Sequence, residues 1–532
     1  MRTHGWLRTA LVAVALLGAL AADGTGARGS GTLTMAQSGP VTALDLAGLT
    51  SERVGPAEGD AAFLVYDGLV RLTENLALAP ELATSWSVSP DGRAWTFTIR
   101  PAVAFQDGTP MTAQAIASEL QRAQNPAATP SSVPRWDPTA SVTASDAAKL
   151  QITTKEPNGA LLNSLADASA LIPSPAAVEK WGADYKAHPI GSGPYIVDRW
   201  DPGAQLELTR NPKYWGAAPG LDRIVLRAEP DPTIRSALLR NGQVQVAEGL
   251  LPEDAADLRR LPSLRILVRP GLRTFGMAIN LNRPALQDVR VRQALNYAVS
   301  KELLVKALFG DSASVLRAPL AEQAPGFADV GPWPYDPPKA RRLLDDAGWK
   351  PAPPIGIRVK DGTSLEVVML TPVGVFPHDV EVTETLADYL RNVGFEPHFL
   401  YAEAATFWDL LLAPSGQLRW DLVLFGLGPS NGDSSLHLDA RYRSNPDRQS
   451  RPPAWNITWY AKPQVDVWLD GANRALDPRV RAAADARIER QVWADAPYLW
   501  LYAEDIFVGT SKDVKGVEVL PTGFTILRSA TR

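Results

Sequence analysis

The stretch LEVVMLTPVGVFPHDVEVTETLADYLRNVGFEPHFLYA (365–402) decides the fold class. It begins and ends with an apolar, strand-like segment, and a helix (380–392) is predicted between the two. A second helix and the apolar strand WDLVLF (420–425) follow it. Strands separated by helices predict an α/β lobe with a mainly parallel sheet. The same alternation begins near residue 274 and covers the rest of this region.

Turn and capping residues mark the borders of other elements. Residues 84–100 and 195–210 each place a Pro/Gly turn between two strand-like runs, which predicts two β-hairpins. Asp-Pro pairs open three predicted helices, because Asp caps a helix and Pro fits its first turn; they begin at Asp231, Asp336 and Asp477. The strand-like run YLWLYAEDIFVG (498–509) lies far along the chain and could cross back to the N-terminal strands.

The composition limits the classes of protein that this chain can belong to. With 532 residues, more than one domain is expected. The net charge of −5 argues against a general nucleic-acid binder, which needs a basic surface. The chain has no cysteine, which excludes Cys-ligated zinc, iron–sulfur clusters and thiol catalysis. The size permits a stable core without disulfides.

The N-terminus has the pattern of a secretory signal peptide. MRTHGWLR contains two arginines and no acid, and the apolar segment 9–22 ends in small residues. Residues 1–22 are therefore predicted to be removed after Ala21 or Ala22, which leaves a protein outside the cytoplasm. The alternative, a membrane anchor, is weaker because the apolar run is short for a bilayer.

The loop GLGPSNGDSS (426–435) follows the buried strand 420–425, where α/β sheets place ligand clefts. It does not have the G-x-G-x-x-G spacing of a dinucleotide loop, and Pro429 interrupts it. The segment GSG (191–193) precedes Pro194 and reads as a tight turn. We therefore expect a cleft wall at 426–435 rather than a phosphate site.

The sequence shows neither a catalytic motif nor a metal-binding motif. None of the five histidines has the spacing of a helical metal site, and no serine lies in a nucleophile elbow. A metal site or a Ser-His-Asp triad would have to be assembled across the fold. The chain is predicted not to be an enzyme and to use no cofactor or resident metal. Most of its 16 tryptophans are expected in the core and a few in a cleft.

Six stretches, in this order, resemble the solute-binding proteins of bacterial ABC importers, in the peptide/nickel branch called family 5. They are YDGLV (66–70), PELATSWSVSPDGRAWTFTIRPAVAFQDGTPMTA (80–113), HPIGSGPY (188–195), LTRNPKYWG (208–216), DVRVRQALNYAVSKELL (288–304) and YDPPKARRLLDDAGW (335–349). The resemblance implies a two-lobe, periplasmic-binding-protein-like α/β fold of type II, with an extra α+β domain beside lobe I. Mapped here, lobe I takes 32–75, 186–270 and 500–532, the extra domain 76–185, and lobe II 271–499.

The resemblance also bears on the ligand. Dipeptide-binding relatives hold the peptide ammonium with an Asp, and Ser430 stands at that position. They hold the carboxylate with an Arg, where this chain has Val375 or Phe376. Nickel-chelate relatives use an Arg near the segment matching 167–174, which contains none. An ordinary dipeptide is therefore not expected, unless Asp433 and an Arg elsewhere act as substitutes.

The predicted function is an extracytoplasmic receptor that delivers a small organic ligand to an ABC permease by closure of its lobes. The receptor is expected to be a monomer that binds no nucleic acid. A nickel- or metal-chelate receptor of the same family and a secreted hydrolase are the alternatives. The predicted ligand contacts are Ser430, Asn431, Asp433, Phe376, His378, Trp408, Arg135 and Trp136.

Overall fold

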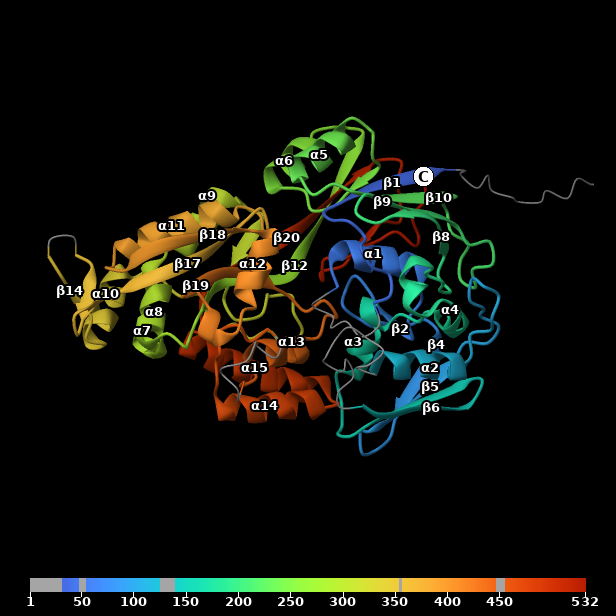
Figure 1. Ribbon diagram of the computed structural model, residues 1–532, viewed down its shortest axis with the longest axis horizontal. Helices are drawn as coiled ribbons and strands as arrows, with labels where there is room; N and C mark the ends of the chain where they lie inside the picture. Colours follow the sequence, from blue (N-terminus) through green and yellow to red (C-terminus); the bar gives the residue numbers. More distant parts are fainter. Residues whose placement is uncertain (1–30, 47–53, 125–138, 354–355, 446–454) are drawn as a thin grey trace, which may run out of the picture.

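Two long antiparallel strands, β12 (Leu264–Ile279) and β20 (Tyr498–Ser511), join the two lobes of one eleven-stranded sheet (Figure 1). β20 also pairs with β11 (Val246–Ala247), which pairs with β1 (Thr32–Gln37). The prediction that residues 498–509 return to the N-terminal strands is therefore confirmed. The computed structural model describes residues 31–46, 54–124, 139–353, 356–445 and 455–532.

Lobe I contains the strands on one side of the crossing pair. Their order outward from β20 is β11-β1-β10-β9-β8, and β1 runs parallel to both of its neighbours. Helix α1 packs its buried side chains against β1, β9 and β10. The remaining bounds are β8 Tyr195–Asp201, β9 Gln205–Arg210, β10 Arg223–Ala228, α1 Pro56–Val65, α5 Pro232–Arg240 and α6 Pro252–Leu258.

Lobe II contains three parallel strands in the order β18-β17-β19, as the alternation predicted. Helices α8, α9 and α11 cover one face of this sheet, and α12, α13 and α15 cover the other. All six residues of β19 are buried, which explains its continuous apolar run. The bounds are β17 Glu366–Val373, β18 Glu396–Glu403, β19 Leu422–Leu427, α7 Pro284–Gln287, α8 Val289–Ala298, α9 Lys301–Leu308, α10 Pro337–Asp346, α11 Asp379–Arg391, α12 Ala404–Leu411, α13 Ser434–Tyr442, α14 Pro463–Arg474 and α15 Pro478–Asp495.

A separate four-stranded antiparallel sheet, in the order β4-β5-β7-β6, packs on helix α2. The predicted hairpin at 84–100 is confirmed as β4 and β5, with Trp86 paired to Phe97. Trp95, Phe97 and Ile99 point into the core, as period-two alternation requires. The bounds are β4 Ala83–Val88, β5 Ala94–Ile99, β6 Thr139–Asp146, β7 Lys149–Thr154, α2 Ala113–Gln124, α3 Leu161–Leu165 and α4 Pro175–Trp181.

The three predicted Asp-Pro helix starts are confirmed. Asp231, Asp336 and Asp477 are the N-caps of α5, α10 and α15, and each carboxylate accepts a backbone N–H of the first turn. The remaining short strands are β2 Val70–Leu72, β3 Leu78–Pro80, β13 Ala313–Val315, β14 Lys350–Pro351, β15 Arg358–Lys360, β16 Thr363–Ser364, β21 Glu518–Val519 and β22 Thr525–Ile526.

Residues 1–22, the predicted signal peptide, lie outside the described residues. Among the residues that the structure describes, none of the helices is both long and apolar enough to cross a membrane.

Candidate functional site

The loop between β19 and α13, residues 428–433, is a tight turn held against the crossing strand β12. A Cβ on Gly428 would lie 2.9 Å from the backbone of Arg273, so only a glycine allows the loop to approach β12 this closely. Gly432 has a φ of +69° and donates its N–H to Pro429 O over 3.0 Å. The glycines of this loop therefore serve the turn, and they place Ser430 and Asn431 at its tip.

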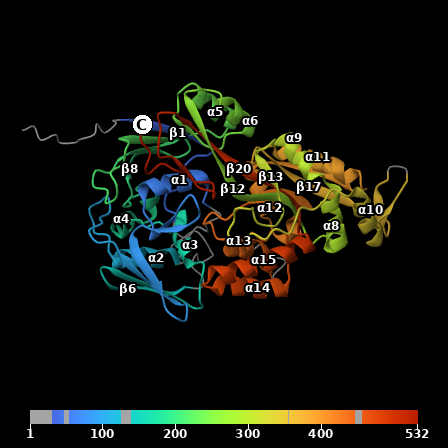
Figure 2. The same cartoon turned by 180° about the vertical axis from the view of Figure 1, so that it is seen from behind.

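The tip of this loop contacts residues that belong to the other side of the lobe boundary. Ser430 Oγ lies 3.5 Å from Asp167 Oδ2, and Asn163 donates its side-chain amide to Asn431 O over 3.1 Å. Nearby, Gly159 N donates to Asn473 O over 2.8 Å, which joins the start of α3 to α14. Both views show α13 and α14 beside α3 (Figures 1 and 2). The loop thus forms part of the junction between lobe II and its neighbours.

Asp433 has a structural role in this junction. Its carboxylate caps α13 by accepting Leu436 N over 2.9 Å. Arg481 Nη2 lies 2.7 Å and 2.6 Å from its two oxygens, and Arg481 Nη1 donates to Gly159 O over 3.2 Å. Both carboxylate oxygens of Asp433 are thus already paired with Arg481. The contact of Asp433 with a ligand stays a prediction.

Asp485, beside this ion pair, makes the stability of lobe II depend on pH. Burial is the main cause that raises the pKa of Asp485 to about 7, against the lowering effect of a hydrogen bond from Ser435. The folded protein therefore keeps a proton that the unfolded chain releases above about pH 4. The contribution of Asp485 to stability is expected to fall as the pH rises from about 4 to about 7, by at most about 1.4 kcal/mol per pH unit.

The variant Asp485→Asn tests this dependence, because its amide can keep a hydrogen bond with Ser435 but has no proton to release. We expect the variant to gain stability over the parent protein as the pH rises from about 5 to about 7.5. Urea unfolding followed by tryptophan fluorescence at several pH values measures the difference. A stability difference that stays constant over this range would contradict the assignment.

An aromatic cluster lies at the carboxyl ends of the lobe II strands and contains two of the predicted contacts. Phe376 packs edge-on against Phe275, with ring centres 5.4 Å apart. Trp408 packs against Phe425 with ring centres 6.3 Å apart, and 37% of its surface remains exposed. Asp379 holds the loop by accepting Val375 N and Phe376 N. Trp408 therefore has an accessible ring, whereas Phe376 is a packing residue with a partly buried side chain.

His378 faces lobe I from the same loop. It adopts a left-handed conformation with a φ of +53°, and its ring lies edge-on to Phe309 at 5.3 Å. Its Nε2 lies 3.9 Å from Glu253 Oε2 of α6. His378 is thus a second point, besides Ser430, where lobe II approaches its neighbours. Arg135 and Trp136, the remaining predicted contacts, lie outside the described residues.

A cavity of about 440 Å³ opens beside Ser430, within the size range of small-molecule sites. Ser430 is its contribution from lobe II, and the other walls come from β2, β3, the segment after β9 and the C-terminal segment. The larger side chains that line it include Phe63, Arg71, Glu81, Tyr214, Trp215, Phe524 and Arg528.

Arg71 is the cation of this cavity that has no partner in the described part of the chain. Its side chain is exposed, and it forms neither an ion pair nor a side-chain hydrogen bond there. A guanidinium presents a planar set of donors that matches a carboxylate. An anionic group of a ligand would therefore find an accessible partner at Arg71.

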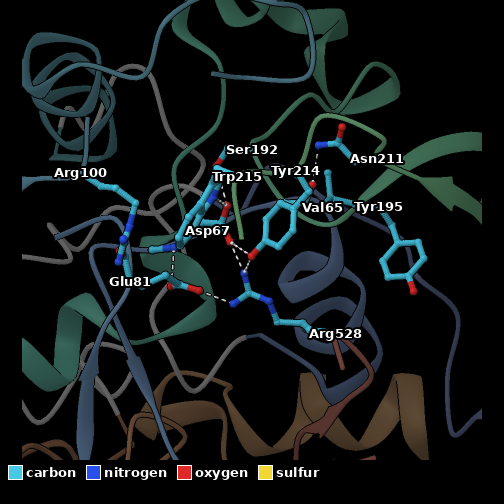
Figure 3. A network of polar contacts seen from close by, with 12 residues as sticks. Val65, Asp67, Glu81, Arg100, Ser192, Tyr195, Asn211, Tyr214, Trp215 and Arg528 are labelled. Atoms are coloured by element: carbon cyan, nitrogen blue, oxygen red, sulfur yellow. Dashed lines mark hydrogen bonds and ion pairs between the residues drawn. The ribbon is translucent and has the colours of Figure 1, made fainter. Parts of the chain in front are cut away.

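The opposite aromatic wall is fixed by a buried polar network (Figure 3). Arg528 forms ion pairs with Asp67 and Glu81 and donates to Tyr214 Oη over 2.9 Å. Trp215 Nε1 donates to Asp67 Oδ2 over 2.8 Å. Burial raises the pKa of Glu81, although the charge of Arg528 opposes this shift. The network leaves Tyr214 and Trp215 in one orientation along the cavity.

Four residues of this cavity were not predicted from the sequence as site residues: Arg71, Tyr214, Trp215 and Arg528. Tyr214 and Trp215 lie in LTRNPKYWG (208–216), a stretch that carried the family resemblance. This adjacent aromatic pair could have indicated a binding surface. In the described parts of the chain, no group of three or more His, Cys, Asp or Glu side chains is placed to hold a metal ion.

Comparisons with known proteins agree with this architecture. Residues 77–449 match the family model described as bacterial extracellular solute-binding proteins, family 5 Middle. The glutathione-binding protein GsiB of Pectobacterium atrosepticum is 30% identical over 466 residues, which cover 86% of each chain. The GsiB protein of Shigella dysenteriae is 29% identical over 471 residues, covering 86% of this chain and 87% of the relative.

Solved structures show the same fold. NikZ from Campylobacter jejuni in complex with Ni(L-His) superposes with a TM-score of 0.82 at 26% identity, covering 94% of this chain and 97% of the other. DppA from Helicobacter pylori in complex with the peptide STSA gives a TM-score of 0.79 at 22% identity, covering 94% and 98%. The second likeness concerns the fold alone.

Proposed function

Since the chain belongs to the bacterial extracellular solute-binding proteins of family 5, we propose that it binds a small, peptide-like solute with a carboxylate beside Ser430 and Arg71. The proteins of this family bind small solutes outside the cytoplasm and pass them to ABC import permeases. The prediction of a solute receptor for an ABC importer is thereby confirmed. The relatives are binding proteins rather than enzymes, which favours a solute receptor over the secreted hydrolase.

The observation that carries the proposed ligand class is the exposed Arg71 in a cavity of about 440 Å³. An Arg that is free to form a bidentate contact favours a carboxylate over a neutral group. The Ser430 hydroxyl faces the same cavity from lobe II and can donate to or accept from the solute. Tyr214 and Trp215 supply flat apolar surface, as is common in small-molecule sites.

The nature of position 430 supports a solute other than an ordinary dipeptide. A serine carries no charge to neutralise a buried ammonium group, and an unpaired buried charge is costly. The relatives named glutathione-binding proteins support a peptide-like solute with more than one carboxylate. We therefore propose the class of solute and not glutathione itself.

Closure of the lobes over the solute is the proposed mode of capture. We propose that the chain divides into lobe I (32–75, 186–270 and 500–532), the extra domain (76–185) and lobe II (271–499). Contacts across the boundary, Ser430 with Asp167 and His378 with Glu253, support a closed arrangement in which ligand contacts with both lobes stabilise the state. We also propose that residues 1–22 are a cleaved signal peptide and that the receptor acts as a monomer without nucleic acid.

Calorimetric titration of ligand-free protein tests the proposed ligand class. We expect glutathione or a related peptide with an additional carboxylate to bind, and a zwitterionic dipeptide to bind more weakly. The variant Ser430→Asp is expected to shift this preference toward the dipeptide, because its carboxylate can pair with the ammonium group. Preference for the dipeptide in the parent protein, or for nickel–histidine over every peptide, would contradict the proposal and favour the other branch of the family.

A further inference from the structure

Arg441 is a buried cation without a carboxylate partner in the described part of the chain. It lies on α13 with only 1% of its surface exposed. Its Nη1 donates to Thr274 Oγ1 over 2.9 Å, whereas its Nε has no hydrogen-bond partner. The guanidinium carbon lies 4.5 Å from the centre of the Tyr498 ring. A permanent charge in this position is costly unless a negative group compensates it.

Several polar groups around Arg441 are also buried and unpaired. Both ring nitrogens of His437, one helical turn earlier, have no hydrogen-bond partner. The same holds for the hydroxyls of Tyr442 and Tyr498 and for the indole N–H of Trp500. The Tyr442 and Tyr498 rings meet edge to face at 6.4 Å, and Tyr498 stacks on Trp500 at 5.0 Å. Each of these side chains can donate a hydrogen bond, so a single acceptor placed among them would satisfy several unpaired donors.

The acids of the neighbouring helix α15 do not neutralise this cluster. Glu489 accepts the backbone N–H groups of Leu320 and Ala328 over 3.1 Å and 2.9 Å. Asp485 accepts from the Ser435 hydroxyl over 2.9 Å. Burial and, next, the charge of Arg441 lower the pKa of His437 well below its ordinary value, so its ring is neutral. One positive charge therefore remains, surrounded by donors.

We propose that lobe II contains a binding site for a small monovalent anion, of the halide kind, between α13 and β20. Arg441 supplies the charge, and the hydroxyls of Tyr442 and Tyr498 donate hydrogen bonds together with His437. A halide accepts hydrogen bonds from any direction, which suits donors that come from a helix and a strand. The anion is distinct from the transported solute, because Arg441 is buried and does not line the cavity beside Ser430.

The position of this site gives it a consequence for the ligand loop. Thr274, which accepts from Arg441, pairs with Leu427 across the β12–β19 ladder. Leu427 directly precedes loop 428–433. Arg441 and Thr274 therefore connect the proposed anion site to the base of the loop that presents Ser430.

Thermal unfolding of the full chain in sodium chloride, sodium bromide and sodium gluconate at equal ionic strength tests the proposal. Chloride and bromide are expected to raise the unfolding temperature saturably over gluconate, because a ligand of the folded state stabilises it. This halide-specific rise is expected to disappear in Arg441→Met and to persist in Arg479→Met, which removes an exposed arginine of α15. An equal rise in both variants, or none in the parent protein, would overturn the site.

A second measurement does not depend on how well the variants fold. Crystals of the parent protein soaked in bromide are expected to give an anomalous peak beside the Arg441 guanidinium. Density for water molecules alone at this position would show that solvent satisfies the donors, and the proposal would be wrong. An anomalous peak found only at exposed arginines would lead to the same conclusion.

Discussion

Replacing Arg528 by Met is expected to destabilise the protein by about 3–5 kcal/mol, the typical cost of breaking a buried ion pair from one side. The change leaves the carboxylates of Asp67 and Glu81 buried without their cation, and these side chains are 0% and 4% exposed. Tyr214 also loses a hydrogen bond, so the aromatic wall of the cavity loosens. Thermal or urea-induced unfolding of the ligand-free protein measures the effect.

Arg93→Met is the matched control for this prediction. Arg93 pairs with Asp91 over 3.0 Å, but both side chains are about half exposed, so water replaces the lost partner. We expect little change in its unfolding midpoint. If Arg528→Met unfolded at the same midpoint as Arg93→Met, the network of Figure 3 would not be the support of the cavity wall.

Replacing Arg71 by Met is expected to weaken binding of a carboxylate-bearing solute roughly ten- to hundred-fold, because a hydrogen bond to a charged group contributes about 1.5–3 kcal/mol. Stability should be little affected, because Arg71 is exposed and has no partner among the described residues. Calorimetric titration is done with the solute and with its amide, in which an uncharged amide replaces the carboxylate. The comparison separates the contribution of the ligand's charge from that of its shape. The amide is expected to bind the parent protein and the variant equally.

The control for this experiment is Arg199→Met. Arg199 is an exposed arginine of β8 that does not line the cavity and forms no ion pair within the described residues. Its loss changes the net charge of the protein by the same amount as the loss of Arg71. If both variants weakened binding equally, the effect would come from the overall field of the protein rather than from a direct contact.

Much of the fold could be predicted from local signals in the sequence. The apolar runs at 365–370 and 420–425 indicate buried parallel strands, because both faces of β17 and β19 are covered by helices. The Asp-Pro pairs mark helix starts through contacts within one turn, as Asp231 shows with Thr233 and Ile234. Because such interactions join residues that are close in the sequence, the sequence alone is enough to predict them.

The candidate site was less predictable because its parts meet only in three dimensions. Arg71, Tyr214 and Arg528 lie in three distant parts of the sequence, and nothing local indicates that one cavity contains all three. The loop 426–435 was predicted as a cleft wall because ligands bind at the ends of buried strands, and the family resemblance then pointed to Ser430 within it. Asp433 looked equally available in the sequence, but its partner Arg481 lies 48 residues later and binds both carboxylate oxygens.

Mass spectrometry of the compound released from purified, denatured protein tests the central claim most directly. The released compound, added back to ligand-free protein, must then bind in a calorimetric titration. We predict a peptide-like organic molecule that carries at least one carboxylate beyond that of a simple zwitterion and binds Arg71→Met more weakly. A neutral sugar, a nickel chelate, or an ordinary dipeptide that binds regardless of Arg71 would contradict the account.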